Sequence, residues 1–105
     1  MTMDFDSALQ VVVESIRKVA GPEAGDRAAG DHYTALSEVG FDEAGKISLL
    51  VSRIDSVTAR RGKPLNPMWG ISISPYTSVR DVANHVMYGT DSTGPKIRRD
   101  DAMTA

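Results

Sequence analysis

The chain has 105 residues, 41% of them hydrophobic and 25% charged, and its formal net charge at pH 7 is -2. These values are typical of one soluble domain with a modest core, and the slight negative charge argues against general nucleic-acid binding. The chain contains no cysteine, which excludes disulfides, thiolate metal sites and cysteine nucleophiles. Since we find neither an apolar run of membrane-spanning length nor a signal-like start, we expect a cytoplasmic monomer that does not engage a membrane.

The first predicted helix spans Asp4 to Ala20. Its start is acidic and its end is basic, which suits the helix dipole, and Gly21-Pro22 is a stop signal. Apolar residues recur along one side of this helix at a spacing close to 3.6: Phe5, Leu9, Val12, Val13, Ile16 and Ala20. We interpret it as a core helix.

Few large apolar residues occur between Gly21 and Gly40, where glycine, alanine and aspartate dominate. This composition predicts a long loop, with Tyr33 and Leu36 as its anchors in the core. Loops of this length are uncommon in compact domains and are often functional.

The second predicted helix runs from about Glu43 to about Thr58, with Asp42 as its N-cap. The residues at core spacing are Ile47, Leu50, Val51 and Ile54. The opposite side is a small, nearly uncharged strip made of Gly45, Ser48, Leu49, Ser52 and Ser56. The basic residues Arg60, Arg61 and Lys63 follow, which favours the dipole at the helix end.

Residues 64–75 have the least regular pattern. Ile71 and Ile73 alternate with serines as in a short strand, although no partner strand is evident. Met68 and Trp69 are candidates for a pocket wall, but a lone tryptophan beside isoleucines more often belongs to a core.

The last predicted helix begins with Ser78 as its cap and ends at Gly89. Val79, Val82, Ala83, Val86 and Met87 line one side of it. Beyond this helix the apolar spacing ends, so we expect a helical domain at 1–89 and a flexible tail at 90–105.

Catalysis has little support in the sequence. His32 and His85 belong to no ligand or triad spacing, and we interpret them as a loop residue and a helix-surface residue. Asp42 and Glu43 are better explained as partners of the helix start than as a catalytic carboxylate pair. The sequence therefore predicts a protein that is not an enzyme and has no metal site.

The segment from Leu36 to Asp42, Leu-Ser-Glu-Val-Gly-Phe-Asp, resembles the Leu-x-Glu-Leu-Gly-x-Asp-Ser-Leu motif of acyl carrier proteins. The start of the last helix, Ser78-Val79-Arg80-Asp81, also resembles the Thr-Val-x-Asp opening of that family's final helix. The resemblance implies an all-α, acyl-carrier-protein-like bundle of three main helices plus a short extra helix. In that family a long loop joins the first two helices, and the short helix lies in the region of 64–75.

The family's motif ends in the serine that receives 4′-phosphopantetheine, and here this position is Glu43, beside the matching Asp42. A glutamate accepts no phosphodiester, so the resemblance implies a module of fatty-acid, polyketide or peptide-type biosynthesis that carries no cofactor as written. It would instead bind a partner enzyme such as a synthase, ligase or transferase. The expected partner-binding residues are Lys46, Ser48, Leu49, Ser52 and Arg53. A variant of this hypothesis is that the natural residue at 43 is serine and that the natural protein carries 4′-phosphopantetheine.

Two alternatives from other classes remain open. One is a helical regulatory or nucleic-acid-associated domain that uses its basic residues: Arg60, Arg61, Lys63, Lys96, Arg98 and Arg99. The other is a small-molecule-binding bundle built around Trp69.

Overall fold

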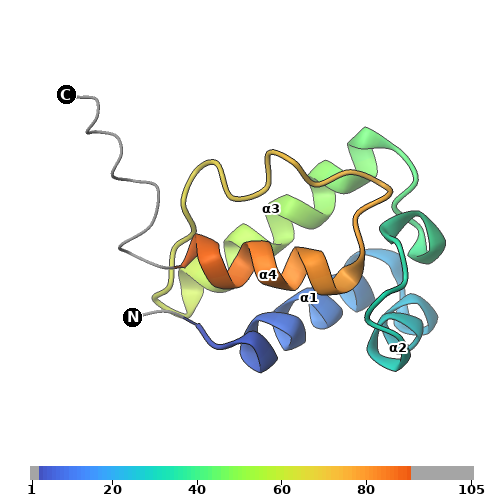
Figure 1. The fold of residues 1–105 in the computed structure, drawn as a ribbon, viewed down its shortest axis with the longest axis horizontal. Coiled ribbons are helices and arrows are strands. Elements are labelled where there is room, and N and C mark those ends of the chain that lie inside the picture. The colour runs from blue at the N-terminus through green and yellow to red at the C-terminus, as the bar shows by residue number, and fades with distance from the viewer. Residues whose placement is uncertain (1–2, 91–105) are drawn as a thin grey trace.

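The structure is a computed structural model that describes residues 3–90, and these residues form an all-helical bundle (Figure 1). Its α-helices are α1 (Phe5–Ala20), α2 (Pro22–Gly30), α3 (Ala44–Arg60) and α4 (Val79–Gly89), with a short 3-10 helix, η1, at Leu36–Val39. Residues 3–90 contain no strand, only an isolated antiparallel bridge between Ala35 and Ser78. The predicted all-α bundle is confirmed.

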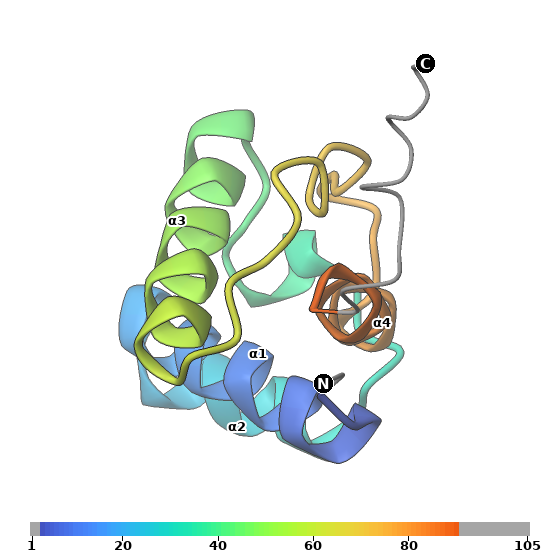
Figure 2. The ribbon, with the colours of Figure 1, turned by 90° about the vertical axis from the view of Figure 1, so that its left-hand side faces the viewer.

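Helix α1 is the centre of the packing, because it contacts α2, α3 and α4 (Figures 1 and 2). Asp4, predicted as the first residue of this helix, is its N-cap, and its Oδ1 accepts a hydrogen bond from the Ser7 backbone N–H at 2.8 Å. Val12, Val13 and Ile16 of the predicted face are buried, whereas Ala20 at its end is exposed. The apolar spacing therefore identified the correct buried face.

The long loop predicted for residues 21–40 was wrong, because the segment contains α2 and η1. Gly21 ends α1 with a φ of 105°, and Pro22, whose φ is already helical, starts α2 immediately. Leu36 is a buried anchor, as expected. Tyr33 is not, because its side chain is 73% exposed; the Arg80 guanidinium lies 5.7 Å from its ring centre.

The connection from α3 to α4 is a chain of turns that crosses between these helices (Figure 2). It forms neither the strand suggested by the Ile71–Ser74 alternation nor the short helix implied by the resemblance, since the shorter helices of this bundle, α2 and η1, both lie between α1 and α3. Trp69 and Ile73 are buried, whereas Ile71 is 74% exposed. The two isoleucines thus face opposite environments without belonging to a sheet.

Helix α4 begins at the predicted cap, where the Ser78 Oγ accepts from the Asp81 N–H at 3.1 Å. The N–H of Val79 donates to the Thr34 carbonyl at 2.9 Å, which ties the start of α4 to the segment before η1. Thr90, which was assigned to the tail, is 7% exposed, and its Oγ1 accepts from the Met3 N–H at 3.1 Å. The helical domain therefore includes Thr90, and the rest of the predicted tail, 91–105, lies outside the described residues.

Most of the predicted core is buried. The confirmed residues are Val12, Ile16, Leu36, Ile47, Leu50, Ile54, Val79, Val82 and Val86. Phe5, Leu9 and Val51 are partly buried at its edge. Phe41, at 1% exposed, is a large core residue that the helical spacing missed because it lies outside any helix.

Candidate functional site

The start of α3 differs by one residue from the prediction. Glu43, not Asp42, occupies the N-cap position, with extended backbone at φ -135° and ψ 154°, and its side chain makes no capping hydrogen bond. The Asp42 Oδ1 instead accepts from the Lys46 Nζ at 3.1 Å, and this contact is the main reason why the pKa of Asp42 lies below its usual value. Helix α3 consequently begins with an exposed glutamate whose carboxylate accepts no hydrogen bond from the backbone N–H groups of the first helical turn.

The chain before this position is held by structural contacts. Gly40 has a φ of 100°, a left-handed conformation that favours glycine, and it allows the next residue, Phe41, to enter the core. The Glu38 Oε1 accepts from Arg27 of α2 at 2.8 Å. The residues that carry the motif resemblance therefore have local structural roles, and Glu43 is exposed two residues after the buried Phe41.

Four of the five expected partner-binding residues are exposed on α3: Lys46, Ser48, Leu49 and Ser52. Leu49 is 59% exposed, although it is a large aliphatic residue. Arg53 differs from them, since it is half-buried and its Nε is enclosed without a hydrogen-bond partner among the residues described. The predicted strip is therefore exposed on α3, but Arg53 is not fully part of it.

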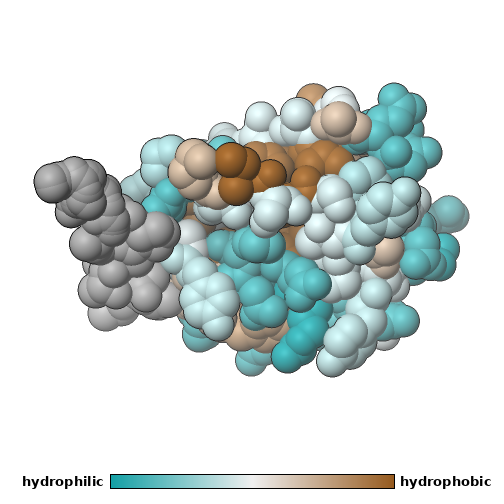
Figure 3. Space-filling model, turned by 45° about the horizontal axis from the view of Figure 1, so that its top comes forward, coloured by the Kyte–Doolittle hydropathy of each residue, from teal (hydrophilic) through white to brown (hydrophobic). Residues whose placement is uncertain are grey.

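An open groove of about 490 Å³ runs beside this strip, between α3 and residues 70–75. We call it the α3 groove. Ile47, Val51 and Ile73 supply its apolar walls, and Ser48 and Ser52 supply hydroxyls. Figure 3 shows hydrophobic side chains gathered along this face between paler and hydrophilic ones. Sequence reasoning missed the groove because half of it comes from the turns of the α3–α4 connection.

The histidines lie apart from the α3 groove. His85 is half-buried on α4, and its Nε2 lies 3.5 Å from the Ser72 Oγ. His32 lies in a turn, as predicted, and its carbonyl accepts from the Arg80 N–H at 2.7 Å. Within residues 3–90, no three histidine or acidic side chains are grouped closely enough to hold a metal ion.

The basic residues of the nucleic-acid alternative are only partly described. Arg60 and Arg61 are exposed at the end of α3, and Lys63 is half-buried. Lys96, Arg98 and Arg99 lie outside the described residues, so this alternative stays a prediction.

Comparisons of the chain with protein-family models, with curated proteins and with solved structures found no match. Among the helices described, none combines the length and the apolar character that a membrane crossing requires. The carrier-protein resemblance consequently rests on the motif residues of the sequence, and the geometry at Glu43 is the place to test it.

Proposed function

We propose that this protein is an acyl-carrier-protein-like module that binds a biosynthetic enzyme through α3 and, with glutamate at position 43, carries no phosphopantetheine arm. The observation that supports this proposal best is the position of Glu43. It lies at the N-cap of α3, exposed and without a capping bond, and the next residue, Ala44, lines the α3 groove. A serine at this position would present its hydroxyl to a transferase, and the helix N-terminus would favour the phosphodiester.

The exposed strip gives the proposed partner a surface to bind. Leu49 is a large apolar side chain among small neighbours such as Gly45 and Ser52, so a partner helix or loop can approach the backbone of α3 closely. Lys46 at the edge of this strip is already paired with Asp42, which leaves the surface with little net charge. We therefore expect apolar contact rather than long-range charge attraction to dominate partner binding.

The first experiment measures intact mass after incubation with coenzyme A and a promiscuous phosphopantetheinyl transferase. We expect no change for the protein as written and a gain of one phosphopantetheine for Glu43→Ser. Modification of the protein as written would place the handle at another hydroxyl, such as Ser48, and would overturn the site. Failure of a folded Glu43→Ser protein to be modified would overturn the carrier resemblance.

The second experiment tests the surface, with the transferase as a surrogate partner enzyme. In the Glu43→Ser background, Leu49→Asp should slow modification about tenfold, the loss expected when one anchoring contact is removed. Tyr33→Asp is the matched control, because Tyr33 is also exposed but lies away from α3, before η1. Equal rates for the two variants would exclude the strip as the binding surface.

A further inference from the structure

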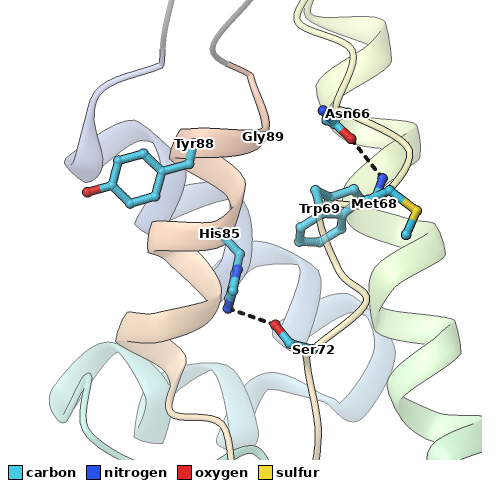
Figure 4. Close-up of a pocket in the computed structure, with 7 residues that line it drawn as sticks. All are labelled: Asn66, Met68, Trp69, Ser72, His85, Tyr88 and Gly89. Atoms are coloured by element: carbon cyan, nitrogen blue, oxygen red, sulfur yellow. Dashed lines mark hydrogen bonds between the residues drawn. The ribbon is translucent and has the colours of Figure 1, made fainter. Parts of the chain in front are cut away.

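A second cavity lies away from Glu43, between the first half of the α3–α4 connection and the last turns of α4. We call it the Trp69 pocket; its volume is about 220 Å³ (Figure 4). Trp69 forms one wall, and His85 lies across from it on α4, with Ser72 below it. Met68 also lines the cavity, but its thioether points away from His85. Tyr88 also contributes to the lining, but its ring points away from Trp69, and the residue is 64% exposed. The proposed partner surface on the outer side of α3 does not use this cavity.

The walls of the Trp69 pocket are held before any ligand arrives. The Trp69 Nε1–H donates to the Asp55 Oδ1 at 2.7 Å, so the indole is locked against α3. The Asn66 N–H donates to the Gly89 carbonyl at 2.9 Å, which fixes the connection to the end of α4. A Cβ on Gly89 would lie 2.9 Å from the Trp69 Cβ, so the glycine is what allows this close approach. A preformed site spends little binding free energy on ordering its own side chains.

The polar groups of the pocket can form stronger hydrogen bonds than the one they make with each other. The His85 Nε2 and the Ser72 Oγ are 3.5 Å apart, at the outer limit of a hydrogen bond, so a ligand atom placed between them can make a better bond to each. A neutral imidazole offers one donor and one acceptor, and a serine hydroxyl offers both. Among the described residues that line the pocket there is no Asp, Glu, Lys or Arg. An ionised ligand would therefore find no counter-charge on the walls.

We propose that the Trp69 pocket binds a small, neutral, planar heteroaromatic molecule. Its ring lies against the indole of Trp69, and a ring nitrogen bonds to His85 or Ser72. The volume, about 220 Å³, is below that of typical drug-sized sites, which start at about 300 Å³, so the ligand has one or two fused rings. This proposal does not depend on the proposed function at Glu43.

The test uses the intrinsic fluorescence of Trp69, the only tryptophan of the chain. Benzimidazole at a pH where it is neutral should cause a saturable change in emission. Indene has the same shape but no nitrogen, and it should bind about five to ten times more weakly, the effect of losing one hydrogen bond. Benzoate should bind more weakly still because it is ionised. A signal that does not saturate, or equal binding of indene and benzimidazole, would overturn the proposal.

The two histidines supply an internal control in the unmodified protein. In a nitrogen-detected NMR titration with benzimidazole, the ring signals of His85 should shift and those of His32 should not, since His32 lies in the turn before η1. His85→Phe keeps a planar ring but removes both ring nitrogens, so it should reduce the preference for benzimidazole over indene, with Ser72 as the remaining polar partner. His32→Phe should leave that preference unchanged. A shift at both histidines, or at neither, would refute binding in this pocket.

Discussion

Gly25 and Gly45 are both helical glycines, yet the structure predicts opposite effects when each is replaced by alanine. A Cβ on Gly25 in α2 would lie 2.6 Å from the Cβ and 3.1 Å from the Cα of Arg17. These atoms belong to the framework of α1 rather than to a flexible side-chain end, so the two helices must separate. A Cβ on Gly45 in α3 would meet no atom within 4 Å.

The expected magnitudes follow from two opposing effects. Alanine is favoured over glycine inside a helix by about 1 kcal/mol, and this gain applies to both positions. Overpacking costs about 1–3 kcal/mol, and at Gly25 we expect the upper part of this range because the contact is so short. Gly25→Ala should therefore lower the free energy of unfolding by about 1–2 kcal/mol, whereas Gly45→Ala should raise it by up to about 1 kcal/mol.

Urea denaturation followed by far-UV circular dichroism measures both values, with the slope of the transition as the check that the two proteins unfold in the same way. For a domain of this size, the difference corresponds to melting temperatures about 10–20 °C apart. Equal stabilisation by the two substitutions would refute the close contact between α1 and α2. It would also remove the reason why a helix forms where the sequence predicts a loop.

Two further substitutions test single polar groups. Ser15 is 1% exposed and its Oγ has no hydrogen-bond partner among the residues described, so Ser15→Ala should leave the free energy of unfolding unchanged or raise it by up to about 1 kcal/mol. A clear loss in urea denaturation would show that the hydroxyl is bonded. At the start of α1, the hydrogen bond from the Ser7 backbone N–H holds the pKa of Asp4 below its usual value. The ionised carboxylate therefore stabilises the folded protein at pH values above the pKa that Asp4 has in the unfolded chain. This stabilisation is lost as the pH falls through the lower pKa that Asp4 has in the folded protein. Asp4→Asn keeps a neutral cap, and its urea midpoint should fall less than that of the unmodified protein between neutral pH and about pH 3; equal losses would contradict this assignment.

Local pattern was sufficient for the helices whose signals lie next to each other in the chain. Ser78 caps α4 as predicted, Asp4 lies at the start of α1, and the apolar spacing of Ile47, Leu50 and Ile54 gave the buried side of α3. Such features depend on hydrogen bonds and periodicity within a few residues, so the sequence alone is enough to locate them. The exposed position of Leu49 follows from the same spacing.

The elements that the sequence did not reveal depend on contacts between distant segments. Helix α2 has little apolar surface of its own and is stabilised because Gly25 lets it lie close to α1. Trp69 becomes a pocket wall because its indole N–H donates a hydrogen bond to Asp55 on α3. The apolar spacing of α3 predicts which residues turn inward, but only the tertiary structure shows what they face. The α3 groove and the Trp69 pocket exist because the α3–α4 connection packs against two helices that the sequence predicts well. The connection itself has no regular apolar spacing, so the sequence does not predict where it packs.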